Sequence, residues 1–380
     1  MKLRTLVALT AFGGMVTLLP ASSTAQPAQP TKAADQLKAT VEKATAFLKK
    51  SQGEDGGWGK AGMNEGVTGI VVAGLLRTGT KPGDAPVAAG LKFIEKLVNK
   101  KEGHIAGDTD KATIINYKTS INVMALSAAD KEKYKVVIAN AVKYLKEYQW
   151  DEARGKKDDS DYYGGAGYAG DKSRPDLSNT AFFLEALKDA GVSQDDPAFK
   201  KALVFVGRCQ NFKSEFNKAP WAEKNNDGSF VYTGANGGEN RRDDAARTTD
   251  LGGYGSMTYA GVKSMIYCGA GKEDPRVKKA LEWIGKNYTL DANPGMPEAS
   301  KLKGLFYYYH TFAKAMNALG DDTFTDAKGV KHDWRADLIA AIAKRQKEDG
   351  SFVNDSDKWM EGDANLVTGY ALMALSYCKK

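Results

Sequence analysis

An eight-residue helix start that occurs twice constrains the fold of this chain more than any other feature. The segment Asp196–Leu203 returns as Asp274–Leu281, and in both copies an Asp and a Pro precede apolar residues at helical spacing. An Asp at the N-cap followed by Pro at the first helical position is a favourable helix start. The same amphipathic period is found, less strictly, from Asp84 onward and in the segments 35–50, 131–147 and 333–345. The sequence therefore predicts six similar amphipathic helices.

A second type of helix, richer in small residues and Tyr, alternates with the first. Its copies align on a Thr seven residues before a Leu, and four copies keep both residues: Thr68/Leu75, Thr119/Leu126, Thr180/Leu187 and Thr368/Leu375. Ala260/Tyr267 and Tyr309/Met316 take these places in the other two copies, so successive copies are 51, 61, 80, 49 and 59 residues apart. Glycines follow several of these helices, where a left-handed C-cap is expected. Six helical hairpins are thus predicted.

The turns after the first helix type carry a third repeated signature. The heptapeptide Gln52–Trp58 matches Gln346–Phe352 in its polar and aromatic positions, with a partial copy at 226–230 and a weaker one at 102–105. In such a turn Asp-Gly reverses the chain, Gln caps the helix end, and the aromatic side chain packs between neighbouring hairpins. We therefore expect these aromatic residues to stabilise the fold. The turns also account for the high share of Gly, 40 of 380 residues.

Six hairpins can stack as an open solenoid or close into a ring, and the spacing alone leaves both open. The second helix type carries fewer charges, as expected for an inner layer. The Gln-x-x-Asp-Gly turns between helix pairs resemble the repeats of the squalene cyclase, squalene oxidase and protein prenyltransferase superfamily over about residues 35–380. This resemblance implies one all-α domain at 37–380, an (α/α)6 toroid around a central cavity. A fold of this kind does not by itself assign an activity.

The catalytic motifs of the families that the chain resembles are absent from its sequence. The Asp-x-Asp-Asp motif of class II triterpene cyclases has its nearest counterpart in Asp158–Asp161, where the order differs and the surroundings indicate a loop. Cys268 and His310 lie outside the zinc motif of protein prenyltransferases, and a buried thiol and a hydrogen-bonded His are favoured. Cys268–Gly271 lacks the Glu and Gln of a thioester turn. No metal and no cofactor are therefore expected, and whether the protein is an enzyme stays open.

Candidate site residues lie where the second helix type begins, at the expected mouth of the cavity. Asp176 precedes one such helix, where an Asp is most often an N-cap, and Tyr307–His310 begin another. Consecutive residues of a helix point about 100° apart, so at least one of these Tyr residues should face inward. The catalytic candidates are Asp176, Tyr308 and His310, and the candidates for lining the cavity and binding a ligand are Asp250, Tyr254, Tyr307, Tyr309, Asp363 and Asn365. Two polar insertions, 151–174 and 212–254, are expected to cover one mouth.

The amino terminus has the features of a secretory signal peptide. Lys2 and Arg4 precede an apolar run from Thr5 to Pro20, and the small residues Ser23–Ala25 offer a cleavage site. We expect residues 1–25 to be removed and 26–36 to form a flexible leader. Export to the periplasm or the extracellular space, without a stable membrane anchor, is expected. The net charge of +7 accompanies no recognition motif, so no nucleic-acid partner is expected.

Together these features predict an exported toroid protein that binds a small molecule, a glycan or a protein segment in its central cavity. Two alternatives stay open: a terpene-cyclase-like or other isoprenoid-transforming enzyme, and a polysaccharide lyase or hydrolase. An apolar, aromatic cavity would favour an isoprenoid, whereas a groove with paired acids, His and Tyr would favour a glycan. The polar composition of the two insertions suits a sugar or a peptide better than a bare isoprenoid.

Overall fold

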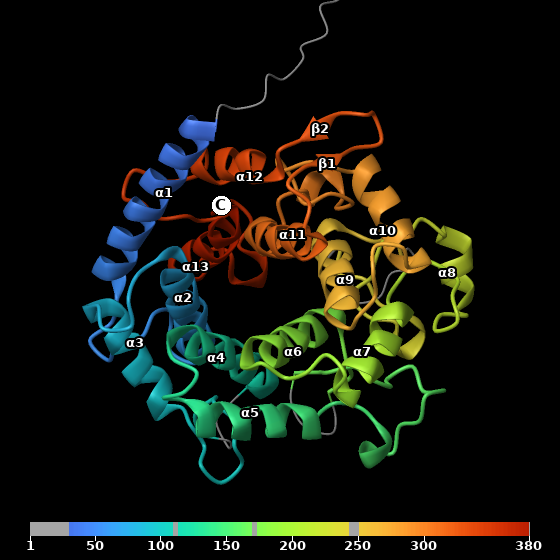
Figure 1. Cartoon of the computed structure of the whole chain (residues 1–380), viewed down its shortest axis with the longest axis horizontal. Helices are drawn as coiled ribbons and strands as arrows, with labels where there is room; N and C mark the ends of the chain where they lie inside the picture. Colours follow the sequence, from blue (N-terminus) through green and yellow to red (C-terminus); the bar gives the residue numbers. More distant parts are fainter. Residues whose placement is uncertain (1–29, 109–112, 169–172, 243–250, 380) are drawn as a thin grey trace, which may run out of the picture.

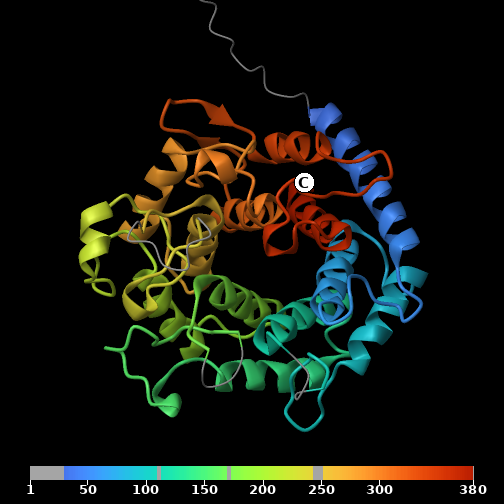
Figure 2. The same cartoon turned by 180° about the vertical axis from the view of Figure 1, so that it is seen from behind.

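The computed structural model describes residues 30–108, 113–168, 173–242 and 251–379, which form two concentric layers of helices (Figures 1 and 2). In this part of the chain the inner layer consists of α2 (Asn64–Thr78), α4 (Ile115–Ala129), α6 (Leu177–Ala190), α9 (Gly255–Tyr267), α11 (Leu305–Leu319) and α13 (Ala364–Leu375). The outer layer consists of α1 (Pro30–Ser51), α3 (Ala85–Lys96), α5 (Lys135–Glu147), α7 (Pro197–Arg208), α10 (Pro275–Lys286) and α12 (Trp334–Ala343). The predicted (α/α)6 toroid is confirmed.

Smaller elements decorate this ring. One short helix, α8 (Pro220–Asn225), lies in the second insertion. The strands β1 (Phe324–Thr325) and β2 (Lys331–His332) form an antiparallel hairpin before α12, with Phe324 opposite His332. Single 3-10 turns are found at Glu152–Arg154, Ala235–Gly237, Glu298–Ser300, Lys358–Met360 and Ser376–Cys378. None of these elements interrupts the alternation of outer and inner helices in the described chain.

The two layers differ in burial as the sequence pattern predicts. In α10 the apolar stripe that includes Val277 is buried, while Lys278 beside it is exposed. In α4, by contrast, every residue from 118 to 126 is buried, because other helices surround the inner layer. The Asp residues of the repeated helix start act as N-caps: Asp196 and Asp274 accept hydrogen bonds from the second backbone N–H of their helices, both at 2.9 Å.

The Thr on which the inner helices align has a structural role. Its hydroxyl oxygen accepts a hydrogen bond from a backbone N–H of the preceding turn. The N···O distances are 2.9 Å from Trp58 to Thr68, 3.2 Å from Ile105 to Thr119, 3.0 Å from Ala166 to Thr180, 3.2 Å from Phe230 to Thr258 and 3.0 Å from Phe352 to Thr368. In α9 this residue is Thr258, so the sequence alignment on Ala260 is two residues out of register. The long insertion before α9 leaves no local spacing that would fix the alignment there.

Glutamine side chains fasten each of four turns to a neighbouring outer helix. Gln52 Nε2 donates to the carbonyl of Gly56 in its own turn and to that of Pro86 in α3, both at 2.8 Å. Three further glutamines make the same pair of bonds: Gln149 to Gly164 and Ala198, Gln210 to Gly228 and Arg276, and Gln346 to Gly350 and Thr40. The amide group therefore joins consecutive hairpins as well as capping its own helix.

The last of these turns closes the ring, because Thr40 belongs to α1. Gly350 has a φ of +87° and lies so close to α1 that a Cβ atom there would be 2.3 Å from the Lys43 carbonyl oxygen. In the inner layer α13 packs on α2, and a Cβ atom at Gly369 would lie 2.8 Å from Ile70 Cγ2. Figure 1 shows the first and last hairpins side by side. The chain is a closed toroid, and the open solenoid is excluded.

Buried polar side chains fill the ring toward the C-terminal ends of the inner helices. Glu185 of α6 pairs with Lys263 of α9, at 3.0 Å, and with Lys314 of α11, and all three side chains are at most 2% exposed. Burial lowers the pKa of Lys263 to about 7 and holds that of Lys314 well below its usual value. Nearer the helix ends, Arg77 pairs with Asp189. Any open space in the ring therefore lies toward the opposite, N-terminal ends.

The amino-terminal boundary differs from the sequence prediction. Helix α1 begins at Pro30, so residues 30–36, which were expected to belong to a flexible leader, are helical. The predicted signal peptide, residues 1–25, lies outside the described residues and stays a prediction. Within the described ranges, no helix combines the length and the apolar character needed to cross a bilayer. The toroid thus begins several residues earlier than predicted.

Candidate ligand-binding cavity

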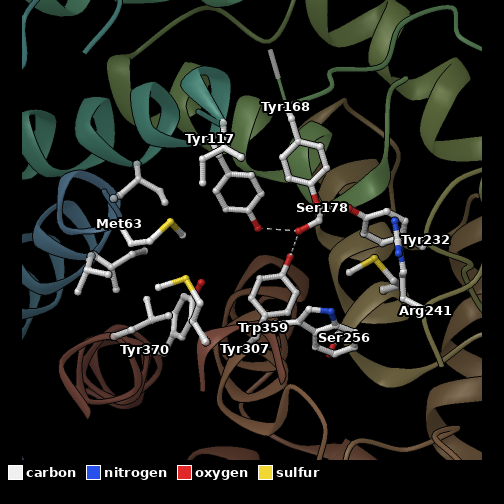
Figure 3. Close-up of a pocket in the computed structure, with 18 of the residues that line it drawn as sticks. Met63, Tyr117, Tyr168, Ser178, Tyr232, Arg241, Ser256, Tyr307, Trp359 and Tyr370 are labelled. Carbon is white, nitrogen blue, oxygen red and sulfur yellow. Dashed lines mark hydrogen bonds between the residues drawn. The ribbon is translucent and has the colours of Figure 1, made fainter. Parts of the chain in front are cut away.

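A cavity of about 370 Å³ lies at the N-terminal ends of the inner helices (Figure 3). Each inner helix contributes the same repeat position to its wall, the residue two places before the aligned Thr or its counterpart: Gly66, Tyr117, Ser178, Ser256, Tyr307 and Leu366. Two residues along a helix are about 200° apart around its axis. Because the aligned Thr faces the outer turns, the residue two places before it faces the centre of the ring. The cavity is therefore a product of the repeat itself.

Most of the cavity wall is apolar. Val67, Ile70, Ile121 and Met257 share it with several aromatic side chains. Of the residues that the structure describes, no Asp or Glu lines the cavity, and Arg241 is its one charged side chain. A cavity of this size and character is typical of sites that enclose a small organic ligand.

Three hydroxyl groups form a hydrogen-bonded bridge across the cavity (Figure 3). Ser178 Oγ of α6 lies 2.7 Å from Tyr117 Oη of α4 and 2.8 Å from Tyr307 Oη of α11. The two hydrogen bonds within the bridge use two of its three hydroxyl hydrogens, which leaves one to donate to an acceptor outside it. Burial raises the pKa of both tyrosines well above their usual value, so the bridge is uncharged.

A second polar group, contributed by the two insertions, lies beyond Ser178 (Figure 3). The hydroxyl groups of Tyr168 and Tyr232 are 2.6 Å apart. The Arg241 guanidinium group stacks over the Tyr232 ring, 5.2 Å from its centroid, and pairs with Glu239 at 2.9 Å. Arg174 pairs with the same carboxylate at 2.6 Å. One side of the cavity is therefore rich in hydrogen-bond donors, and the insertions supply it.

Backbone strain is concentrated at this cavity. Ile114, Trp359 and Met360 all line it, and their φ angles are +49°, +56° and +67°. The left-handed region is unfavourable for residues with a Cβ atom, and a β-branched Ile is rarely found there. Strained backbone persists where the surrounding structure holds it, commonly at ligand sites. Trp359 is also 43% exposed, which places a large aromatic side chain at the edge of the cavity.

The side chains of Tyr307–His310 point in different directions, as consecutive residues of a helix must. Tyr307 lines the cavity, and so does the predicted Tyr254. Tyr308 and Tyr309 instead donate their hydroxyl hydrogens to the carbonyl oxygens of Thr289 and Leu290, at 2.7 and 2.6 Å. These carbonyls belong to the segment after α10, so both hydroxyl groups are directed to the outer layer. Tyr308 and Tyr309 therefore tie two layers of the toroid together and do not line the cavity.

Asp176, the predicted acid, is fully buried and is the N-cap of α6. It accepts hydrogen bonds from Asn179 N at 2.8 Å and Asn179 Nδ2 at 2.9 Å. Burial raises its pKa to about 6, although these hydrogen bonds, Arg174 and the Tyr232 hydroxyl oppose the rise. Asp176 is not part of the cavity wall, although the Tyr232 hydroxyl, which helps to hold its pKa down, belongs to a residue of that wall.

His310 is buried behind the residues of the cavity wall and does not line the cavity. Its ring stacks against Phe182 and Tyr307, with centroids 5.8 and 6.3 Å away, and packs at a tilt against Tyr370, 5.4 Å away. Neither ring nitrogen has a hydrogen-bond partner among the described residues, unlike the hydrogen-bonded His that the sequence favours. Burial and the nearby Lys263 hold the pKa of His310 well below its usual value, so the ring is neutral. Aromatic packing thus replaces the expected hydrogen bond.

The remaining candidates have structural partners or lie outside the described residues. Asp363 is the N-cap of α13 and accepts hydrogen bonds from Asn365 N and Leu366 N, at 2.9 and 3.1 Å. Asn365 Oδ1 accepts a hydrogen bond from Ser51 Oγ at 2.6 Å, which ties α13 to α1. Asp250 lies outside the described residues. Asp363 and Asn365 therefore fasten the last inner helix and do not line the cavity.

The described residues hold no group of three or more His, Cys, Asp or Glu side chains placed to bind a metal ion. Cys268 is a buried thiol at the C-cap of α9, as the sequence favours, and burial raises its pKa. The wall residues that sequence reasoning missed are mainly Tyr117, Tyr168, Tyr232, Arg241 and Tyr370. Three of them lie in the insertions, and Tyr117 has the same repeat position as Tyr307, a signal that the aligned Thr residues already contained.

Comparisons with known proteins agree with the fold and leave the activity open. No protein-family model matches the chain, and no curated protein sequence does. A type II terpene cyclase, MstE from Scytonema, solved with geranylgeranyl dihydroxybenzoate, is similar with a TM-score of 0.59 at 11% identity over 92% of this chain and 99% of that one. A glycoside hydrolase family 76 mannosidase, Bt3792 from Bacteroides thetaiotaomicron, has a TM-score of 0.54 at 12% identity over 89% and 98%. At these identities the similarity shows a shared α/α-toroid fold.

Proposed function

We propose that this protein binds a small molecule of isoprenoid type, whose apolar part lies in its central cavity. The observation that carries the proposal is the cavity wall: apolar and aromatic side chains surround about 370 Å³, and no described carboxylate lines it. Apolar surface that leaves water on binding supplies the driving force for such a ligand. The terpene cyclase with the same fold holds a geranylgeranyl group joined to an aromatic acid, a ligand of the class proposed for this chain.

A glycan is the weaker candidate. Most enzymes that hydrolyse glycosidic bonds use two carboxyl groups that flank the bond, about 5 to 10 Å apart. No described carboxylate lines this cavity, and Asp176, the predicted acid, serves as the buried N-cap of α6. The proposal is therefore one of binding. A chemical step is not part of it, because the described wall offers neutral tyrosines and one guanidinium group rather than an acid.

We also propose that the chain is exported. The basic start, the apolar run from Thr5 to Pro20 and the small residues before Gln26 support a signal peptide. Mass spectrometry of the protein recovered from a secreting host is expected to find Gln26 at the amino terminus. Recovery of the intact chain from the cell interior alone would contradict export.

The experiment that tests the binding proposal is native mass spectrometry with a variant whose cavity is filled. A Cβ atom at Gly66 would meet only Lys118 Cγ among the described atoms, at 3.7 Å, so Leu fits the backbone there and extends along the cavity wall. The wild-type protein, purified without detergent, is expected to retain an apolar molecule, and Gly66→Leu is expected to lose it. Gly271→Leu is the matched control, because a Cβ atom at Gly271 has no described atom within 4 Å. Retention of a glycan, or equal retention by Gly66→Leu, would overturn the proposal.

A further inference from the structure

We propose that the ligand is amphipathic: an anionic head group binds Arg241 while its apolar tail occupies the side of the cavity between α2 and α13. This inference rests on the proposed function and adds the chemical class of the ligand and its orientation. It is carried by the unequal distribution of polar groups around the cavity.

The cavity has two unlike sides, separated by the hydroxyl bridge of Tyr117, Ser178 and Tyr307 (Figure 3). On one side, Met63 and Tyr370 lie with the apolar residues of α2 and α13, among them Leu366. On the other side, Tyr168, Tyr232 and Arg241 lie together. A purely apolar ligand would leave the N–H groups of Arg241 that do not face Glu239 unused, and an entirely polar ligand would gain nothing from the apolar side.

Arg241 is suited to an anion because, within the described ranges, much of its hydrogen-bonding capacity is unused. The guanidinium group has five N–H donors, and its one ion pair is formed with Glu239, at 2.9 Å, among the described residues. Glu239 is shared with Arg174, at 2.6 Å, so two guanidinium groups face one carboxylate. Tyr232 holds both groups by their faces, with the guanidinium carbons 5.2 and 5.5 Å from its ring centroid. The stacked Arg241 therefore presents its N–H edge without having to be ordered by the ligand.

The hydroxyl bridge places a second recognition element at the junction of head and tail. Its spare hydrogen can be donated from either end, Tyr117 or Tyr307, because the direction of both bonds can reverse together. Tyr168, whose hydroxyl pairs with that of Tyr232, stacks on the bridge residue Tyr117 with ring centroids 6.2 Å apart, so the bridge adjoins the polar side of the cavity. A carboxylate at the end of an apolar chain offers acceptor oxygen atoms for this junction and for Arg241.

Two probes that share one chain and differ in the head group test the inference. Farnesoic acid is a carboxylate at neutral pH, and farnesol carries a hydroxyl group on the same fifteen-carbon chain. Titration followed by tryptophan fluorescence, with both probes below their aggregation concentration, is expected to show that the acid binds about tenfold more tightly or better, the factor that one charge-assisted hydrogen bond supplies.

Arg241→Gln is expected to remove this preference by weakening the acid and leaving farnesol unchanged, and Arg241→Lys is expected to keep part of it. Lys278→Gln, which removes one positive charge from the exposed face of α10, is the matched control and should change neither affinity. Ser178→Ala should weaken both probes. Equal binding of acid and alcohol by the wild-type protein, or an undiminished preference in a folded Arg241→Gln variant, would overturn the anionic head while leaving the proposed function intact. Failure of both probes to bind would overturn the proposed function and this inference with it.

Discussion

Replacement of Gly350 by Ala tests the closure of the ring through one turn. Gly350 has a φ of +87°, and a Cβ atom there would lie 2.3 Å from the carbonyl oxygen and 2.7 Å from the carbonyl carbon of Lys43 in α1. Gly329 is a matched control on the same molecule. Its φ is +81°, but a Cβ atom at that position has no described atom within 4 Å. Both variants are destabilised because Ala must adopt the left-handed backbone conformation, but only Gly350→Ala also displaces α1.

The two free-energy changes can be worked from these contacts. A left-handed Ala costs about 1 to 2 kcal/mol, which is the whole effect expected at Gly329. At Gly350 the displaced α1 also loses the hydrogen bond from Gln346 to Thr40, about 1 kcal/mol. It loses part of the burial of Leu48 too, which is about 1.5 to 3 kcal/mol when complete. We therefore expect Gly350→Ala to lower the free energy of unfolding by about 3 to 5 kcal/mol.

Urea unfolding followed by circular dichroism measures both variants on one scale. The expected result is a fall in the midpoint for Gly350→Ala that is at least twice that for Gly329→Ala. Equal midpoints for the two variants would refute the reasoning, because they would mean that the contact between this turn and α1 contributes nothing to stability. Gly228→Ala, in a turn where a Cβ atom would lie 2.2 Å from the Lys279 carbonyl oxygen, should resemble Gly350→Ala.

Three other substitutions test buried polar groups and strain, each by urea unfolding. Burial raises the pKa of Asp176 from 3.8 to about 6, so the folded state loses stability as pH rises between these values. Above pH 7 the free energy of unfolding of Asp176→Asn should therefore exceed that of the wild type by about 3 kcal/mol, and at pH 3.5 the two should be equal. Equal gains at both pH values would contradict this linkage. Glu185→Gln should lower the free energy of unfolding by about 3 to 5 kcal/mol, because Lys263 and Lys314 lose their shared buried carboxylate. A variant as stable as the wild type would show that this carboxylate does not stabilise the fold. Ile114→Asn should raise the free energy of unfolding by about 1 kcal/mol, because Asn tolerates the left-handed backbone better than Ile, and it should weaken the binding of farnesol. A variant that loses both stability and farnesol binding would contradict the interpretation that Ile114 is strained.

Much of the fold follows from local physical chemistry that a sequence displays directly. The Asp-Pro starts at 196 and 274, the apolar period of the outer helices and the repeated turn at Gln52 and Gln346 are all local patterns, and the structure confirms them. The Gln residues of the other two turns were missed, although the partial copy at 226–230 marked one of these turns, because the insertions separate Gln149 and Gln210 from their glycines. A spacing-based search fails when a loop of variable length stands between the two residues that make contact.

The candidate site was predictable in part. The Tyr of the run at 307–310 that faces the cavity could not be chosen from the run alone, because the rotation of α11 depends on its neighbours. The aligned Thr residues contain the missing information, since the residue two places before each of them faces the centre. The positions of Tyr168, Tyr232 and Arg241 depend on the paths of two irregular loops, and no periodicity describes such paths.

The most direct test of the account is a calorimetric titration of farnesol into the wild-type protein and the Gly66→Leu variant. Farnesol is expected to bind the wild-type protein with a negative change in heat capacity, because apolar surface is buried. Its association with Gly66→Leu is expected to be at least tenfold weaker, and the urea midpoint of this variant should be unchanged or higher because Leu favours the helix over Gly. Undiminished binding of farnesol to a folded Gly66→Leu variant would place the ligand outside the cavity and contradict the central claim.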